Sequence, residues 1–497
     1  MNAAKPGPLN ELLEAVTTLR ETVNREAQPV YETWCRRIVR RGYYADAKNL
    51  ALYLSLRKYD LRALQNALPV YGLTSLTGIE AQVLQTLDGL THTLNLALGK
   101  APATPQPTPQ RYYRGRRALD RNTTEVFGAT ASQRSTRIMV TLPGEAAGDS
   151  ELLTRLCKSG MDWVRINCAH DDPDTWRGLI EALRVAEGAT GKRCGILMDL
   201  GGPKVRVGEV IRPKKSDKLL EAGDTLLLTR DAPQKSATYK FQAQCMIPEA
   251  LEQVQVGHAV FLDDGMVGMR VTAKYEQGIE LKIERTPPEG YKLKPEKGLN
   301  FPDTGLAIPA LTAKDREDLR FVVQYADAVG YSFVQTAQDV QLLLAQIAQH
   351  SDLPRAKALA IIAKIETTTA VYNLPEIMVE AAGKVPFGVM IARGDLSVEL
   401  GWARTAEMQE EILWLCEAAH IPVIWATQVL ESFVKTGLPT RAEMTDAAMG
   451  ERAECIMLNK GPNIVEAVVL LDGLLIRMEG HRSKQRARMR PLLAWSS

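Results

Sequence analysis

The sequence lacks long hydrophobic runs, excess charge of one sign and paired cysteines, and each absence excludes a class of protein. No apolar run approaches the roughly 20 residues of a membrane-spanning helix. Lysine and arginine number 61 and aspartate and glutamate 59, so a net charge of +2 gives no global attraction to nucleic acid or to an anionic membrane. The seven cysteines are scattered without CxxC pairs, which argues against a disulfide framework or a zinc site.

The first residues, MNAAKPGPLNELLEAV, also lack the apolar core of a signal peptide. An odd number of dispersed thiols is typical of a reducing compartment. We therefore expect a cytoplasmic protein, with no nucleic acid and no membrane among its partners. The 497 residues, of which 45% are hydrophobic, are enough for several globular domains.

The chain divides into segments of different composition. Over residues 1–100, apolar residues recur at helical spacing, which predicts an N-terminal all-α domain. Residues 101–134 begin with four prolines and continue with several arginines, a composition typical of a solvated linker. The basic stretch from Arg111 to Arg121 has a second interpretation, contact with an anionic partner. Residues 481–497 form a basic tail, interpreted as a solvated helix end or as a partner surface.

Short β-rich runs follow the predicted linker, and helical patterns separate most of them. The runs are 137–142, 163–168, 194–200, 328–333, 358–366, 387–395, 422–428 and 455–461. Strands that alternate with helices indicate a parallel sheet, and eight such units match a (β/α)8 TIM barrel of α/β class, over residues 135–207 and 297–480. The competing fold is a doubly wound sheet, which usually carries a glycine-rich loop after its first strand. TLPGEAAGD is a poor match to that loop.

The interval between the third and fourth runs is too long for a barrel connection. Residues 208–296 alternate apolar and polar side chains in short runs, which is typical of antiparallel β structure. We predict a small β-barrel domain inserted after the third strand. Because it leaves from the C-terminal end of that strand, we expect it to act as a lid over the active-site face.

Polar side chains stand at the predicted C-terminal strand ends, where barrel enzymes keep their working residues. They are Arg165, Asn167, His170, Asp199, Lys204, Arg206, Ser332, Lys364, Glu366, Arg393, Asp395, Thr427, Gln428, Asn459 and Lys460. Charged groups are costly to bury unless they are paired or metal-bound, so their number predicts a functional site. In ALAIIAKIE, Lys364 and Glu366 are two residues apart and therefore share one face of the strand.

Glu366 and Asp395 supply two carboxylates from neighbouring strands, which is a common way of holding Mg²⁺. The alternative is that each carboxylate pairs with a neighbouring lysine or arginine. Positive charge at the same C-terminal end of the predicted barrel comes from Arg165, Lys204, Arg206 and Lys364. A divalent ion among such cations favours a phosphorylated substrate and phosphoryl transfer, with Lys364 neutralising the transferring group. Thr427 offers a hydroxyl that relays a proton, or is a satisfied core hydroxyl.

These residues stand in motifs that resemble those of pyruvate kinase, over about residues 135 to 480. The motifs are WVRINCAHD, MDLGGPKVRVG, FLDDGMVGMRV, KGLNFPDTGLAIPALTAKDREDL, IIAKIE, VMIARGDLSVEL, ATQVLESFVKTGLPTRAEMTDAA and AECIML. The resemblance implies transfer of a phosphoryl group from phosphoenolpyruvate to ADP, giving pyruvate and ATP. It also implies Mg²⁺ or Mn²⁺ as cofactor and a homo-oligomer formed through the barrel.

The resemblance implies a role for each matching position. Glu366 and Asp395 match the two metal ligands, and Lys364 and Arg165 match the residues that meet the phosphoryl group. Thr427 matches the threonine beside the enolate. The segment whose backbone cradles the substrate carboxylate is matched by Ala392, Arg393 and Gly394. The nucleotide side is matched by Asn167, His170, Arg206 and Lys314.

Several positions depart from the family pattern. Ala169 stands where the family often has a serine that completes a potassium site with Asn167 and Asp199. Leu200 and Gly201 also replace family residues. Lys204 replaces a glutamate, as in the potassium-independent branch of the family. A tethered ammonium at Lys204, beside Asp199, would take the role of the monovalent cation, so we expect K⁺ not to be required.

Further departures leave two alternative functions open. The strand-eight loop reads LNKGPN without the family's glutamate, and Gln335 stands where an arginine is usual. No counterpart of the family's C-terminal regulatory domain follows residue 480, so we expect no regulation through that domain. One alternative is a weakly active or inactive sensor of phosphoenolpyruvate or nucleotide. The other is a magnesium-dependent lyase or aldolase acting on pyruvate or an enolpyruvate, against which the inserted domain and Lys364 argue.

Overall fold

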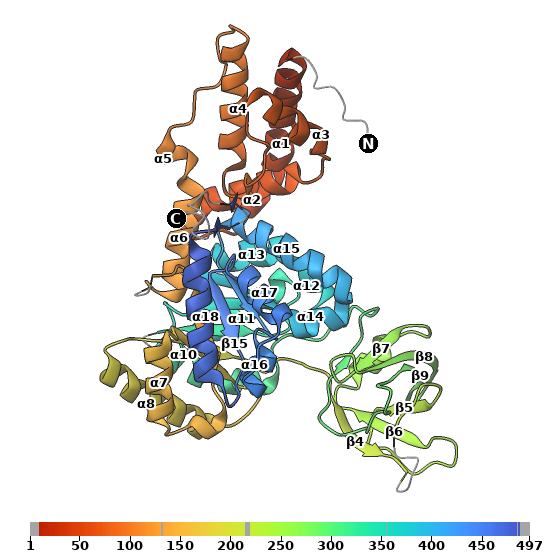
Figure 1. Cartoon of the computed structure of the whole chain (residues 1–497). Helices are drawn as coiled ribbons and strands as arrows, with labels where there is room; N and C mark the ends of the chain where they lie inside the picture. Colours follow the sequence, from red (N-terminus) through yellow and green to blue (C-terminus); the bar gives the residue numbers. More distant parts are fainter. Residues whose placement is uncertain (1–8, 131–132, 214–218, 354, 485, 488–497) are drawn as a thin grey trace.

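The computed structural model describes residues 9–130, 133–213, 219–353, 355–484 and 486–487 (Figure 1). The N-terminal part is helical. Its elements are α1 (Leu9–Cys35), η1 (Arg41–Tyr43), α2 (Tyr44–Leu56), α3 (Arg62–Ala67), η2 (Leu68–Tyr71), η3 (Glu80–Gln82) and α4 (Val83–Ala97). Helix α1 buries Leu12, Val16, Leu19 and Val23, a stripe with three- and four-residue spacing that packs against α2 and α4. Among the described residues, no helix is long and apolar enough to cross a membrane.

Eight parallel strands form a closed barrel, as predicted, in the order β1-β15-β14-β13-β12-β11-β3-β2. They are β1 (Arg137–Thr141), β2 (Trp163–Asn167), β3 (Gly195–Asp199), β11 (Ala328–Tyr331), β12 (Ala360–Ile365), β13 (Phe387–Ala392), β14 (Val423–Ala426) and β15 (Cys455–Leu458). Each of the eight predicted runs contains one of these strands. The TIM-barrel prediction is therefore confirmed, and the doubly wound alternative is excluded.

Helices follow the strands and surround the barrel (Figure 1). They are η4 (Gly144–Ala146), α7 (Ser150–Ser159), α8 (Pro173–Thr190), α10 (Ala313–Tyr325), α11 (Ala337–Ala348), α12 (Thr368–Tyr372), α13 (Leu374–Ala382), α14 (Arg393–Leu400), α15 (Trp402–Ala419), α16 (Glu431–Thr436), α17 (Arg441–Gly450) and α18 (Ile464–Glu479). Helix α14 begins directly after β13, so its first turn lies at the C-terminal mouth of the barrel.

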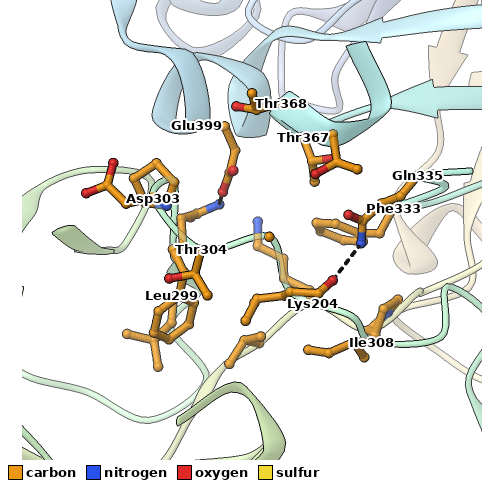
Figure 2. A pocket seen from close by; sticks show the side chains of 18 of the residues that line it. Lys204, Leu299, Asp303, Thr304, Ile308, Phe333, Gln335, Thr367, Thr368 and Glu399 are labelled. Carbon is orange, nitrogen blue, oxygen red and sulfur yellow. Dashed lines mark hydrogen bonds between the residues drawn. The ribbon is translucent and has the colours of Figure 1, made fainter. Parts of the chain in front are cut away.

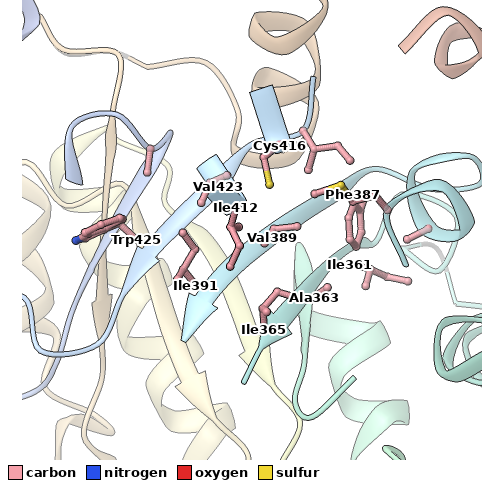
Figure 3. Packing of buried hydrophobic residues seen from close by; sticks show 14 of the residues in the cluster. Ile361, Ala363, Ile365, Phe387, Val389, Ile391, Ile412, Cys416, Val423 and Trp425 are labelled. Carbon is pink, nitrogen blue, oxygen red and sulfur yellow. The ribbon is translucent and has the colours of Figure 1, made fainter. Parts of the chain in front are cut away.

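Alternation along β12 decides which side chains reach the barrel interior. Ile361, Ala363 and Ile365 belong to the large apolar cluster shared with the surrounding helices (Figure 3). Ala360 and Ile362 belong instead to a second cluster that takes residues from all eight strands and fills the interior. Lys364 has the parity of Ala360 and Ile362, and so does Glu366. The strand therefore directs this ammonium and this carboxylate to the inside of the barrel mouth.

The N-terminal end of the barrel is closed by α6 (Arg114–Phe127), which follows the short α5 (Pro109–Tyr112). The ring of Phe127 packs edge-on against Trp163, the first residue of β2, with 5.4 Å between centroids. Trp163 Nε1 donates a hydrogen bond of 2.9 Å to the carbonyl of Phe127. The prediction of a solvated linker over 101–134 is wrong for this helix, because Ala118 and Leu119 are also buried. The apolar face of this helix is narrow and is hard to recognise in a sequence that is rich in arginine.

The segment between β3 and β11 forms a separate β domain beside the barrel (Figure 1). Its sheet has the order β10-β7-β8-β9-β5-β6-β4 and is antiparallel except between β5 and β6. The strands are β4 (Val207–Ile211), β5 (Thr225–Thr229), β6 (Phe241–Cys245), β7 (Ala259–Leu262), β8 (Val267–Tyr275), β9 (Gly278–Arg285) and β10 (Leu299–Asn300), with α9 (Glu249–Gln253) after β6. The domain has its own hydrophobic core, and the prediction of an inserted β domain is confirmed.

Beyond α18 the chain forms a hairpin of β16 (Arg482–Ser483) and β17 (Arg486–Ala487). Lys484 Nζ donates a hydrogen bond of 2.9 Å to the carbonyl of Arg452 and forms an ion pair with Glu454. Of the predicted basic tail, residues 485 and 488–497 lie outside the described residues.

Candidate active site

Lys364 is at the centre of a buried polar cluster at the barrel mouth. Its Nζ lies 2.7 Å from Ser332 Oγ, 3.0 Å from Glu366 Oε1 and 3.4 Å from Asp199 Oδ2. The Ser332 hydroxyl donates to the carbonyl of Leu200, so it accepts from the ammonium. Burial alone would lower the pKa of Lys364, but the carboxylates of Glu366 and Asp199 outweigh it and raise the pKa. The lysine is therefore a buried, charged ammonium.

Asp199 joins two cations of this cluster. Arg165 Nε donates to Asp199 Oδ2 at 2.8 Å, and Arg165 Nη1 donates to Thr141 Oγ1 at 3.3 Å. Burial would raise the pKa of Asp199, but Arg165 and Lys364 together hold it below its ordinary value. A Cβ on Gly330 of the neighbouring strand would lie 1.9 Å from Asp199 Oδ1, so only glycine leaves room for this carboxylate. Asp199 thus fixes a guanidinium and an ammonium side by side.

Asp395 lies in the first turn of α14, and its partner is Lys204. The Lys204 Nζ donates to Asp395 Oδ1 at 2.8 Å and lies 3.6 Å from Asp264 of the inserted domain. Among the described residues, no hydrogen bond or ion pair joins Lys204 to Asp199, the partner expected from the sequence. Asp199 Oδ2 is already shared by Arg165 and Lys364.

Glu366 and Asp395 provide a donor set that fits a divalent ion. The backbone N–H of Phe333 donates to Glu366 Oε2 at 2.6 Å, which fixes the carboxylate. Burial raises the pKa of Glu366, Lys364 opposes this, and repulsion from Asp395 raises it further. A divalent cation bound by both carboxylates would relieve this repulsion. No group of three or more acidic, histidine or cysteine ligands occurs among the described residues, so water and substrate oxygens would complete a magnesium shell.

The loop after β14 carries Thr427, whose φ of 61° places it in the left-handed region. Its Oγ1 accepts a 2.9 Å hydrogen bond from the backbone N–H of Gly394, the second residue of α14. The Arg393 guanidinium donates to the carbonyls of Ala426 and Thr427 and binds the Asp446 carboxylate. The Arg393 side chain therefore fixes the threonine loop. Sequence reasoning missed Asp446, because it lies on α17 and no spacing connects it to Arg393.

The residues expected on the nucleotide side come from the end of β2, the segments after β2 and β3, and the start of α10. Asn167 Oδ1 accepts from the N–H of Ala169 at 3.2 Å, and Arg206 Nη1 donates to the carbonyl of Glu296 at 2.9 Å. Lys314 Nζ donates to the carbonyl of Cys168 at 3.2 Å. His170 has a lowered pKa, caused first by burial and then by the positive charges of Lys460 and Arg206. The strand-eight loop therefore brings Lys460 into electrostatic reach of His170.

A cavity of about 290 Å³ lies beside Lys204, between the segment that returns from the inserted domain and the barrel mouth (Figure 2). Gln335 Nε2 donates to the carbonyl of Leu306 across this cavity at 3.2 Å. Asn300 Nδ2 donates to Glu399 Oε1 at 3.2 Å, and burial raises the pKa of Glu399 to about 7. These contacts hold the inserted domain against the mouth.

Comparisons with known proteins agree with this geometry. The family model "Pyruvate kinase, barrel domain" matches residues 133–463. The chain belongs to the pyruvate kinase family. Among curated members, pyruvate kinase 2 of Trypanosoma brucei brucei is 33% identical over 337 residues, which cover 67% of this chain and 64% of that protein. Pyruvate kinase of Methylorubrum extorquens is 33% identical over 353 residues, covering 70% of this chain and 69% of that protein.

Among solved structures, a pyruvate kinase from Cryptosporidium parvum matches with a TM-score of 0.63 and 29% identity, covering 71% of this chain and 72% of that one. The pyruvate kinase family model begins after α6, so the helical N-terminal part lies outside the matched residues. The chain spans less than two thirds of the length of the Trypanosoma relative.

Proposed function

We propose that the chain is a phosphotransferase of pyruvate kinase type, which moves the phosphoryl group of phosphoenolpyruvate to ADP and gives pyruvate and ATP. The observation that carries this proposal is the position of Lys364. A buried ammonium lies 3.0 Å from Glu366 and shares Asp199 with Arg165 at the mouth of the barrel. Such a group neutralises charge on a transferring phosphoryl group without reorganisation.

Each side chain of the mouth takes one task in this reaction. Glu366 and Asp395 hold Mg²⁺ or Mn²⁺, which supplies charge neutralisation for the phosphoryl and enolate oxygens. Lys364 and Arg165 donate N–H groups to the phosphoryl oxygens while the phosphorus–oxygen bond to the enol breaks and a bond to the ADP oxygen forms. The substrate carboxylate lies against the backbone of residues 392–394, where α14 begins.

Thr427 takes part in delivering the proton that converts the enolate to pyruvate. Its hydroxyl accepts from Gly394, so its own hydrogen is directed elsewhere. The nucleotide binds on the side of Asn167, His170, Arg206 and Lys314. Burial and then the positive charges of Lys460 and Arg206 lower the pKa of His170, so the histidine acts there as a neutral hydrogen-bonding group.

K⁺ is not required for this activity in our proposal. The loop positions that supply hydroxyl ligands in potassium-dependent relatives are Ala169 and Leu200 here, and neither has a hydroxyl. Lys204 brings a fixed ammonium to Asp395 instead. In a sodium-free assay, turnover with and without K⁺ should agree, and a clear stimulation by K⁺ would contradict the proposal.

The deciding experiment mixes purified protein with phosphoenolpyruvate, ADP and either Mg²⁺ or Mn²⁺, and follows pyruvate and ATP together. We expect equal amounts of both products. Binding of phosphoenolpyruvate without turnover in either metal would favour the sensor. Pyruvate formed without ATP would mean that the phosphoryl group passes to water, and would contradict transfer to ADP.

We also propose a cytoplasmic homo-oligomer formed through the barrel. Trp402, at the start of α15, and Tyr372, at the end of α12, are 69% and 76% exposed, so both large side chains are available for a subunit contact. Light scattering of the wild type and of Trp402→Glu tests this. A wild-type monomer would contradict it.

A further inference from the structure

A second cavity, of about 180 Å³, lies where the N-terminal helices meet the barrel, far from the mouth. Residues of α2, α4, α5 and α6 line it, together with His420 in the turn after α15; Figure 1 shows α2 and α6 at this junction. The elements approach closely here. A Cβ on Gly115 of α6 would lie 1.9 Å from the Ala81 carbonyl and 2.4 Å from His420 Nε2. The cavity is therefore part of a tightly fitted domain junction.

The charges that line this cavity are all positive. Lys48, Arg111 and Arg114 contribute cations, and no aspartate or glutamate is among the lining residues. In the part of the chain that the structure describes, Lys48 and Arg111 form no ion pair. Lys48 Nζ lies over the Tyr31 ring at 5.8 Å from its centroid. Arg111 belongs to the basic stretch that the sequence indicated as a contact for an anionic partner.

Asp46 is a buried carboxylate next to the cavity, and it already has three partners. Its Oδ1 lies 3.2 Å from Arg114 Nη2 and 3.0 Å from His420 Nδ1, and its Oδ2 lies 3.6 Å from Arg121. His420 Nε2 lies 3.0 Å from the Ala81 carbonyl, which can only accept, so that nitrogen carries a proton. One carboxylate therefore serves three cationic or hydrogen-bonding groups, while half-buried Lys48 and exposed Arg111 have no carboxylate partner among the described residues.

We propose that this cavity, the junction site (Lys48, Gln85, Arg111 and Arg114), binds a small anion that carries a phosphate group. Phosphate oxygens accept several charge-assisted hydrogen bonds at once, and arginine and lysine are the side chains that best supply them. The volume is below the roughly 300–1,000 Å³ of pockets for drug-sized ligands, so the occupant is small. Gln85 adds an uncharged amide for a hydroxyl or phosphate oxygen.

The junction site is separate from the proposed substrate site. His420 precedes β14, whose first residue is Val423, whereas Thr427 follows its last residue, Ala426. The two sites therefore lie at opposite ends of one barrel strand. A bound anion would contact the helical domain, α5 and α6 together and would stabilise their junction, because it binds the folded arrangement alone.

Titration calorimetry of the full chain with inorganic phosphate, glycerol phosphate and glycerol tests the proposal. We expect a phosphate-bearing probe to bind and to raise the melting temperature, and glycerol to do neither. Binding of glycerol phosphate without inorganic phosphate identifies the ligand as a phosphorylated metabolite, and binding of both identifies the phosphate group alone. The double variant Lys48→Glu, Arg111→Glu should weaken this binding at least tenfold.

The matched control is Lys158→Glu, Arg320→Glu, which makes the same charge change at two exposed residues of α7 and α10 and should bind like the wild type. The mouth also offers cations to phosphate, so Lys364→Met is titrated in parallel and should retain the junction site. Binding that survives reversal of Lys48 and Arg111 but is lost in Lys364→Met would overturn the proposal, as would failure of both phosphate probes to bind. Both outcomes are independent of whether the chain transfers phosphoryl groups.

Discussion

The ammonium of Lys204 lies 2.8 Å from Asp395 Oδ1, on one of the two carboxylates proposed to hold the divalent ion. It also lies 3.6 Å from Asp264, so one cation connects the inserted β domain to the barrel mouth. Burial would lower the pKa of Lys204, but the carboxylates of Asp395, Asp264 and Glu366 together outweigh burial and raise it. Lys204 therefore remains charged at neutral pH, next to the proposed site of phosphoryl transfer.

Lys204→Met removes the positive charge beside Asp395 and should lower kcat/KM by about tenfold or more in buffer free of K⁺. A factor of ten corresponds to a loss of about 1.4 kcal/mol of transition-state stabilisation. Added K⁺ should restore part of this loss, since Asp395 and Asp264 then lack a fixed counter-charge. Steady-state assays with and without K⁺ measure both effects. Lys240→Met, an exposed lysine of the inserted domain, is the control. Unchanged turnover of Lys204→Met without K⁺ would refute the role of this lysine.

Lys364→Met should reduce kcat by at least about 10²–10³-fold, the usual cost of losing one preorganised donor to a developing charge. The change also leaves Glu366 and Asp199 buried without their ammonium, which costs about 3–5 kcal/mol of stability. Mg²⁺ should recover part of that stability, because a divalent ion at Glu366 replaces the lost positive charge. Turnover and melting temperature with and without Mg²⁺ check this. Wild-type turnover in the variant would show that the assigned role is wrong.

The barrel and the core of the site were predictable from the sequence because both depend on local periodicity. Strand alternation in ALAIIAKIE places Lys364 and Glu366 on one face, and parallel strands bring their C-terminal ends to one mouth. The burial of helix α6 was not predictable, because it has few apolar residues among its arginines. Their role is seen only in the structure, where Phe127 packs against Trp163. The ion pairs between side chains of different strands and loops were also not predictable from the sequence. Lys204 contacts Asp395 because the chain turns after β3, and the spacing of residues in the sequence does not predict this turn.

Lys460 lies in the loop after β15, one of the departures from the family pattern, and after burial its charge is the next cause that lowers the pKa of His170. Lys460→Met should therefore raise the pKa of His170. The chain has six histidines, so the imidazole signals can be followed individually by NMR over a pH titration. Lys158→Met, exposed on α7, should leave the titration unchanged. An unaltered His170 pKa in Lys460→Met would mean that the loop does not approach the proposed nucleotide side.

Glu417 provides a test of the junction between the helical domain and the barrel. It lies on α15, is 7% exposed, and its Oε2 has no hydrogen-bond partner among the described residues. Burial and then repulsion from Glu80 raise its pKa to about 8, while Lys484 and Arg486 oppose this and Glu454 adds to it. Between pH 4.5 and 8 the folded chain keeps a proton that the unfolded chain has released. Glu417 therefore lowers the free energy of unfolding as pH rises through this range, and the loss is complete above about pH 8.

Glu417→Gln removes this titration, so its stability relative to the wild type should increase by up to about 1.4 kcal/mol for each pH unit between pH 6 and 8 and then stay constant. Urea unfolding at pH 6, 7, 8 and 9 measures the difference, and groups common to both proteins cancel. Glu411→Gln on the exposed face of the same helix should show no such trend. Parallel curves for Glu417→Gln and the wild type would mean that Glu417 is ionised in the folded chain, and that Lys484 and Arg486 neutralise it more strongly than burial opposes its charge.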